Sequence, residues 1–196
     1  MKGKLIVFYG INNLGKSTQA ALLVERLKKI GLDAEYIKYP LYGLIPTGPM
    51  LNSYLRDGDP LGLTAREAQV VYALNRAHYQ ETLLEKLEAG TNIIAEDYFH
   101  TGIAWGLTRG VEEGFLRKLN ADFILPDIAF LFDGERFTDG IEKGHTHESD
   151  DDLMSRCRVV HKRLGQEESW IDINANGKIE EVRKLIWGHL VNRFSW

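Results

Sequence analysis

A glycine-bounded segment near the N-terminus has the residue types and spacing of a phosphate-binding loop. Residues 10–18 read Gly-Ile-Asn-Asn-Leu-Gly-Lys-Ser-Thr and match the pattern G-x-x-x-x-G-K-S/T in full. Gly10 and Gly15 permit backbone angles that turn successive N–H groups toward an anion, and the start of a helix adds partial positive charge. Lys16 can reach the β- and γ-phosphates of a nucleoside triphosphate, and the Ser17 hydroxyl can bind Mg²⁺. The segment therefore predicts a site for ATP and Mg²⁺.

The neighbouring sequence supports this interpretation against a chance match in a structural turn. The continuous apolar run at 5–9 predicts a strand buried on both faces, and the apolar spacing over 17–30 predicts a helix. The motif therefore lies between a strand and a helix, as its mechanism requires. The residues expected to bind the nucleotide here are Gly10, Asn12, Asn13, Leu14, Gly15, Lys16, Ser17 and Thr18.

Strands and helices alternate along the rest of the chain. We expect strands at 5–9, 34–39, 92–95, 128–132 and 170–173, and helices at 17–30, 51–55, 64–87 and 179–194. Thr64 and Glu67 form a capping box at the start of the longest helix. Ser149 is the expected N-cap of another helix, with the acidic residues 150–152 in its first turn. This order predicts an α/β fold of three layers, α/β/α, with a five-stranded parallel sheet. We expect one domain over residues 1–196, with a short lid at about 134–149. Ligands of such sheets bind at the carboxyl ends of the strands.

Composition excludes several classes of protein. The 196 residues carry 24 Lys and Arg against 28 Asp and Glu, a net charge of −4, which argues against a nucleic-acid partner. A lone cysteine, Cys157, excludes an intramolecular disulfide framework. No apolar run approaches the roughly 20 residues of a membrane span, and the first apolar run is too short for a signal peptide. We therefore expect a cytoplasmic protein that acts on small molecules, with no membrane partner.

Beyond the loop, an ordered set of segments resembles the thymidylate kinase family. Residues 8–19 are similar to its "FEGxDGxGKSTQ" opening, and Tyr39-Pro40 is similar to its segment after the second strand. Further similar segments are Tyr72-Ala73-Leu74-Asn75-Arg76, Ile94-Ala95-Glu96-Asp97-Tyr98, Thr101-Gly102-Ile103-Ala104-Trp105 and Leu125-Pro126-Asp127. The similarity extends from residue 4 to about residue 133 and returns at 170–182. It implies an ATP- and Mg²⁺-dependent kinase that converts a pyrimidine deoxynucleoside monophosphate, most simply dTMP, into its diphosphate.

The same resemblance assigns roles to individual side chains. Arg76 is expected to bond the base edge, Tyr72 to stack on the base, and Trp105 to line the sugar and base pocket. The segment from Asn174 to Lys178 is expected to meet the adenine of ATP. The full set expected to bind the substrate is Tyr39, Tyr72, Arg76, Asp97 and Trp105. Members of the family are commonly dimers, so we expect a homodimer; the apolar side chains of Val70, Val71 and Leu74 supply either an interface or core packing.

The sequence departs from the family where the acceptor phosphate is normally held. The "DR" pair is Glu96-Asp97 here, and the stretch 39–42 contains no cation. Asp97 cannot replace an arginine that binds a phosphate dianion. The loop also has Asn12 and Asn13 where a carboxylate is common. Either another cation serves, or the acceptor is not a monophosphate.

Glu96 therefore has two interpretations. It can bind Mg²⁺ together with Ser17, or it can act as a general base on a sugar hydroxyl, as in a deoxynucleoside kinase. A third possibility is a catalytically weak, nucleotide-binding regulatory relative.

The glycine-rich stretch 133–149 has the composition of a lid that closes over phosphates. Lys143 is the expected lid cation and Arg136 the second choice, while a solvated loop is the alternative. The expected catalytic residues are thus Lys16, Glu96 and Lys143.

Overall fold

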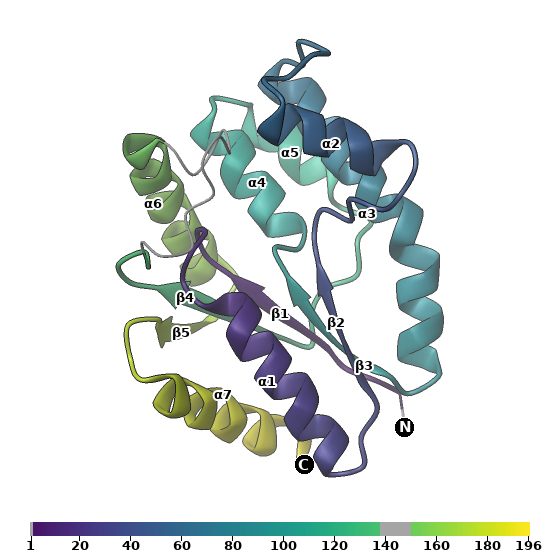
Figure 1. Cartoon of the computed structure of the whole chain (residues 1–196), viewed down its shortest axis with the longest axis vertical. Coiled ribbons are helices and arrows are strands. Elements are labelled where there is room, and N and C mark those ends of the chain that lie inside the picture. The colour runs from purple at the N-terminus through teal and green to yellow at the C-terminus, as the bar shows by residue number, and fades with distance from the viewer. Residues whose placement is uncertain (1, 138–149) are drawn as a thin grey trace.

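A five-stranded parallel sheet forms the centre of the computed structural model, which describes residues 2–137 and 150–196 (Figure 1). The strands are β1 Leu5–Tyr9, β2 Ala34–Lys38, β3 Asn92–Glu96, β4 Ile128–Asp133 and β5 Ile171–Asn174. Their order across the sheet is β2-β3-β1-β4-β5, and every neighbouring pair is parallel. The predicted fold class and the five-stranded parallel sheet are therefore confirmed.

Helices cover both faces of the sheet. They are α1 Lys16–Lys29, α2 Thr47–Arg56, α3 Ala65–Glu88, α4 Phe99–Thr108, α5 Glu113–Leu119, α6 Asp151–Glu167 and α7 Ile179–Phe194. Helices α1 and α7 pack against each other on one face, while α4 contacts α3, α5 and α6 on the other (Figure 1). No helix among the described residues is both long and apolar enough to cross a bilayer.

One helix differs clearly from its predicted extent. The sequence predicts a helix over 51–55, but α2 begins four residues earlier, at Thr47. The early Gly48 and Pro49 favour a turn, although a proline is tolerated in the first turn of a helix, where its missing N–H is not needed. Burial of Leu51 and Leu55 under α3 supplies the stabilisation that helix propensity lacks.

The central strand explains why the core forms around the phosphate-binding loop. All five residues of β1 are buried, and the Phe8 ring contacts those of Phe130 and Phe132 on β4, with centroids 5.7 and 5.0 Å away. Full burial of one such side chain stabilises the fold by roughly 1.5–3 kcal/mol. The strand that ends in the loop is thus held firmly at the centre of the sheet.

Side chains cap the starts of α3 and α6; the cap of α3 is the predicted one, whereas α6 is capped by Asp150, one residue after the predicted cap. The Glu67 amide donates to Thr64 Oγ1 at 3.2 Å, and the Thr64 amide donates to Glu67 Oε2 at 2.8 Å, which completes the capping box. Asp150 caps α6, because its carboxylate accepts from the Leu153 amide at 2.9 Å. These caps satisfy amides that the first turn of a helix leaves without partners.

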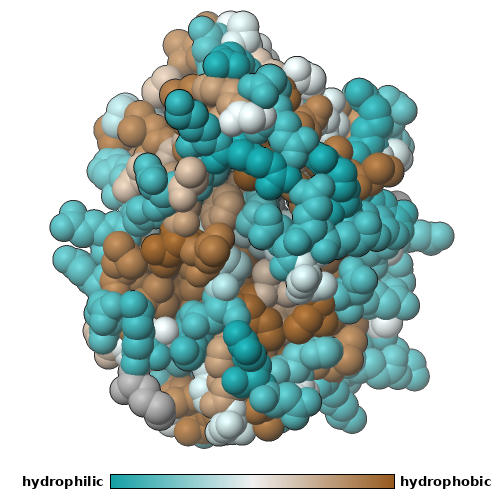
Figure 2. Space-filling view, turned by 180° about the vertical axis from the view of Figure 1, so that it is seen from behind, coloured by the Kyte–Doolittle hydropathy of each residue, from teal (hydrophilic) through white to brown (hydrophobic). Residues whose placement is uncertain are grey.

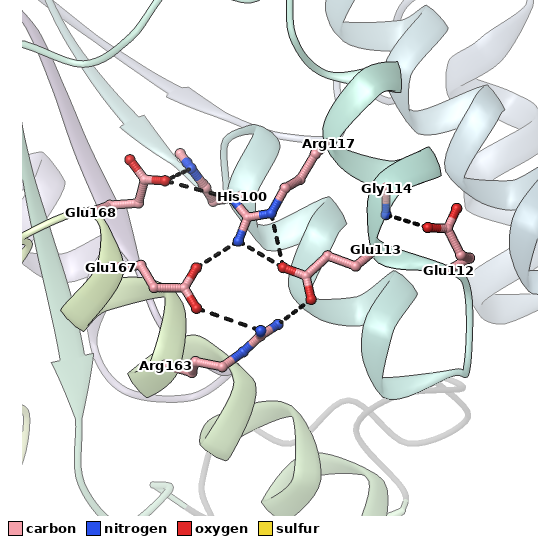
Figure 3. A network of polar contacts seen from close by, with 8 residues as sticks. All are labelled: His100, Glu112, Glu113, Gly114, Arg117, Arg163, Glu167 and Glu168. Atoms are coloured by element: carbon pink, nitrogen blue, oxygen red, sulfur yellow. Dashed lines mark hydrogen bonds and ion pairs between the residues drawn. The ribbon is translucent and has the colours of Figure 1, made fainter.

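A network of charged side chains joins α5 to the carboxyl end of α6 (Figure 3). Arg117 lies 2.7 Å from Glu113 and 2.6 Å from Glu167, and Arg163 lies 3.0 Å from the same Glu113. Glu168 extends the network to His100 on α4, at 3.6 Å. Because the members share partners, the network holds three helices in register more effectively than isolated surface pairs would.

We expect Arg117→Gln to lower the melting temperature by about 2–4 °C at low salt, since it removes about 1 kcal/mol of partly exposed ion pairing. The difference should shrink in 0.5 M NaCl, because salt screens exposed charges. Arg193→Gln, at an exposed position on α7, is the control. Thermal unfolding followed by circular dichroism measures both. Equal melting temperatures for Arg117→Gln and wild type at low salt would contradict the prediction.

Candidate functional site

The loop between β1 and α1 has a backbone shaped by its glycines. Gly10 has φ 126°, and a Cβ there would lie 2.3 Å from the Phe132 carbonyl oxygen, so only glycine fits. Gly15 has φ 75° and precedes α1, which no side chain caps among the described residues. The amides at the start of α1 are therefore available to an anion, in keeping with the predicted phosphate site.

Lys16 lies folded across this loop. Its side chain is only 2% exposed, and Nζ donates to the carbonyl oxygens of Gly10 at 2.9 Å and Ile11 at 2.7 Å. The same Nζ lies 3.5 Å from Asp97 Oδ1. The ammonium group is thus held where a phosphate on the loop would meet it.

Glu96, at the carboxyl end of β3, is a buried carboxylate held by three side chains. Its Oε2 accepts from the Ser17 hydroxyl at 2.7 Å and from the Tyr36 hydroxyl, and its Oε1 lies 3.1 Å from Lys38 Nζ. Burial alone would raise its pKa, but the charges of Lys16 and Lys38 and the two hydroxyl donors outweigh it and lower the pKa. An ionised, bonded carboxylate is a weak base toward a hydroxyl.

Ser17 and Glu96 have the chemistry of a magnesium site. Mg²⁺ prefers oxygen ligands and is commonly held by one or two carboxylates together with substrate phosphates. A hydroxyl and an ionised carboxylate lie side by side here, next to the phosphate-binding loop. Within the described residues no cluster of three or more His, Cys, Asp or Glu exists, so an all-protein metal cage is absent from that part of the chain. The donor set therefore fits a metal shared with a bound phosphate.

Asp97 follows Glu96 and occupies a different environment. It has φ 60°, a conformation that Asp tolerates better than most residues, and its side chain is 11% exposed. Burial, aided by the charge of Glu96, raises its pKa to about 6, although Lys16 and Lys38 act in the opposite direction. Asp97 forms a salt bridge with Lys16.

Next to the loop lies a pocket that gathers all the residues predicted to bind the substrate. Tyr39, Tyr72, Arg76, Asp97 and Trp105 all line it, and so does Asn12. They come from the end of β2, from α3, from the end of β3 and from α4, which approach one another at this edge of the sheet (Figure 1). The sequence assigned no individual role to several further residues that line the pocket: Lys38, Tyr42, Leu55, Arg56, Gln69 and Thr101.

The helical end of the pocket contains buried polar atoms that need partners. Arg76 is 3% exposed and donates to Asn120 Oδ1 at 2.9 Å, while burial lowers its pKa to about 10, so it stays charged. Among the described residues, Gln69 Oε1, Arg76 Nε and Thr101 Oγ1 have no hydrogen-bond partner. A Cβ at Gly102 would lie 3.1 Å from Arg76 Nη2, so glycine keeps the guanidinium uncovered. A ligand with both donors and acceptors suits these groups.

A second pocket lies on the other side of the loop. Its lining includes Leu14, Thr18, Phe137 and Lys178, and the Phe137 amide donates to the Asn13 carbonyl at 2.8 Å. Asn174, expected beside the adenine, instead accepts from the Asn176 amide at 3.1 Å and is not among the lining residues. Two pockets therefore flank one phosphate-binding loop.

The predicted lid cations have different outcomes. Lys143 lies outside the described residues. Arg136 is described, and its Nη1 donates to Asp151 Oδ1 at 3.0 Å at the start of α6. On α6 itself, Arg158 and Lys162 contact Asp133 at the carboxyl end of β4. Arg158 Nη2 and Lys162 Nζ each lie 3.1 Å from Asp133 Oδ2. These pairings join residues 25 and 29 positions apart, so no local pattern in the sequence indicates them.

Comparisons with known proteins agree with one another. The family model described as Thymidylate kinase matches residues 8–186. The thymidylate kinase of Halothermothrix orenii is 29% identical over 95% of this chain and 96% of its own length. That of Dictyostelium discoideum is 24% identical over 94% of this chain and 83% of its own. The solved structure of thymidylate kinase from Candida albicans covers 97% of this chain and 92% of its own, at 21% identity with a TM-score of 0.82, and supports the fold.

The raised pKa of Asp97 predicts a pH-dependent effect of Asp97→Asn. The protonated carboxyl is favoured in the fold, so its contribution to stability is present below pH 3.8 and is lost as the pH rises through about 6. Asparagine tolerates the same backbone conformation and carries no charge. We expect the variant to gain about 1–3 kcal/mol in free energy of unfolding relative to wild type between pH 4 and pH 7.5.

Urea denaturation at the two pH values measures the difference. Asp122→Asn, at an exposed position, is the control. A variant that is less stable than wild type at pH 7.5 would mean that the ion pair with Lys16 outweighs the cost of burying the carboxylate.

Proposed function

The chain belongs to the thymidylate kinase family, and on this basis we propose that it transfers the γ-phosphate of ATP to dTMP, forming ADP and dTDP. The observation that carries the proposal is the placement of two pockets on either side of one phosphate-binding loop, with Lys16 across it. A kinase that joins two nucleotides needs this arrangement, because the donor and acceptor phosphates must meet in line.

The loop and Lys16 act on the donor. The amides at the start of α1 bind the ATP phosphates, and the Lys16 ammonium exchanges the Gly10 and Ile11 carbonyl oxygens for phosphate oxygens. Charge that develops on the transferred group is then met by groups already in position, which is the main contribution that proteins make to phosphoryl transfer.

The helical end of the other pocket receives the acceptor base. Arg76 bonds the base edge, and Tyr72 and Trp105 contact its ring, roles that the family resemblance suggests and that the unpartnered buried atoms support. A phosphate acceptor is already nucleophilic, so no general base is required. Glu96 is ionised, and three side chains contact its carboxylate. Such a group is a poor base for a sugar hydroxyl, so its state agrees better with a phosphate acceptor.

Ser17 and Glu96 would hold Mg²⁺ in this reaction. When bound, the ion offsets negative charge on the phosphates of ATP. The Ser17 hydroxyl is already oriented by the carboxylate at 2.7 Å, so the two ligands need little reorganisation. The lid role of Lys143 and a cytoplasmic location, without nucleic-acid or membrane partners, stay predictions.

We also propose that the enzyme is a homodimer that pairs through α3. Val70 and Leu74 lie four residues apart on one side of this helix and are 44% and 55% exposed. In the view from behind, apolar side chains gather on the side of the molecule along which α3 runs (Figure 2). Exposed apolar side chains on a long helix are the kind of surface that a second copy covers.

Lys16→Ala should lower kcat/KM for ATP at least a hundredfold with dTMP as acceptor, because the ammonium that meets the developing charge is removed. Lys29→Ala, at the exposed far end of the same helix, should leave turnover unchanged. ADP formation measures both, with thymidine as the comparison acceptor. Wild-type turnover of thymidine in preference to dTMP, or full activity of Lys16→Ala, would contradict the proposed function.

Leu74→Arg should convert the dimer into a monomer, because it places a charge in the apolar interface. Leu185→Arg, at a comparably exposed position on α7, should leave the dimer intact. Sedimentation velocity at micromolar concentration distinguishes the two species. A monomeric wild-type protein, or a dimer that tolerates Leu74→Arg, would contradict pairing through this face.

A further inference from the structure

The acceptor phosphate has a defined place in the pocket, if the proposed function holds. It must lie at the end nearest the phosphate-binding loop, because it receives the γ-phosphate bound there. Asn12, Lys38 and Asp97 line this end, and the last two come from the carboxyl ends of neighbouring strands. The unpartnered polar atoms of Gln69, Arg76 and Thr101 lie on helices α3 and α4 instead.

This end of the pocket carries little net positive charge. Glu96 and Asp97 contribute two carboxyl groups, against the ammonium groups of Lys16 and Lys38. Lys16 is bonded to the loop that binds the donor. A phosphate dianion that approaches Asp97 therefore needs a second cation beside it, because repulsion in a partly buried site is strong.

Three cationic side chains line the pocket among the described residues, and two of them are placed for other contacts. Arg76 is bonded to Asn120 at the helical end. Arg56 lies over the Tyr42 ring, 4.7 Å from its centroid, and donates to Asn52 on its own helix. Lys38 is the remaining one, and it projects from the strand next to β3.

Lys38 is both charged and able to accept a further partner. Its side chain is 52% exposed, and its Nζ contacts Glu96 Oε1 at 3.1 Å. A lysine side chain that contacts a carboxylate is an ammonium at neutral pH. An ammonium has three N–H donors, and the bond to Glu96 occupies one of them.

We propose that Lys38 binds the phosphate of the acceptor monophosphate and so determines that the enzyme takes a nucleotide and not a nucleoside. Strand β2 then supplies the cation that is missing at Asp97 and in the stretch 39–42. Lys38 sits one residue before Tyr39, which lines the same pocket, so the strand end presents an ammonium and an aromatic ring to the acceptor together.

Binding of dTMP and thymidine to Lys38→Met tests the proposal, because the two ligands differ by the phosphate alone. Isothermal titration calorimetry should show a 10- to 100-fold weaker Kd for dTMP, as expected when one charge-assisted bond is lost, and a Kd for thymidine within twofold of wild type. Lys38→Arg keeps the charge and should retain most of the affinity for dTMP. Arg56→Met is the matched control and should affect the two ligands alike.

Several outcomes would overturn the proposal. They are an unchanged dTMP affinity in Lys38→Met, an equal loss for dTMP and thymidine, or a phosphate-dependent loss in Arg56→Met alone. If wild type prefers dTMP and Lys38→Met keeps this preference, only the role of Lys38 is wrong. If wild type binds and phosphorylates thymidine in preference to dTMP, the proposed function fails, and the role of Lys38 fails with it.

A double-mutant cycle with Glu96→Gln separates direct contact from charge compensation. If Lys38 touches the phosphate, Lys38→Met should still weaken dTMP binding at least fivefold in the Glu96→Gln background. If the loss disappears there, Lys38 acts only by neutralising Glu96, and the proposal is wrong. Thermal unfolding of each variant verifies that the protein remains folded.

Discussion

The parallel pairing of β1 and β3 is the constraint on which the whole site depends. Phe8 lies beside Glu96 in the register of these strands, so the loop that follows β1 and the acidic pair at the end of β3 must meet at one edge. Parallel strands place their carboxyl ends together, and the full burial of β1 prevents any shift in register. Every contact between Ser17, Lys16 and the acidic pair follows from this alignment.

At the carboxyl edge of the sheet, opposite charges are paired within the protein itself. Glu96 is buried yet ionised, since Ser17, Tyr36 and Lys38 bond its two oxygens. A buried carboxylate without such partners would take up a proton. Asp97, with fewer partners, approaches that state, and its raised pKa reflects the difference. Two adjacent carboxyl groups thus have different chemistry because their surroundings differ.

The features shared with the family and the departures from it lie mostly in different parts of the site. The full loop motif is present with a pocket on each side, and Tyr72 and Arg76 lie on one helix in the first of these pockets. The departures are the groups expected around the acceptor phosphate, together with Asn12 and Asn13 in the loop. In our proposal the reaction is preserved because Lys38, on the neighbouring strand, supplies the positive charge from another direction.

The sequence by itself determined the elements and the loop. A continuous apolar run, a helical repeat and a capping box are local signals, so β1, α1 and the start of α3 could be predicted closely. Residues in quoted motifs, such as Tyr72, Arg76 and Trp105, could likewise be assigned to one pocket. Only the tertiary structure decided which partners Glu96 and Asp97 have, and that Lys38, Arg56 and Gln69 join the same pocket. The hydrogen bonds of Ser17 and Tyr36 to Glu96, for example, join residues 79 and 60 positions apart. Their geometry depends on strand order and helix packing, which no local pattern encodes.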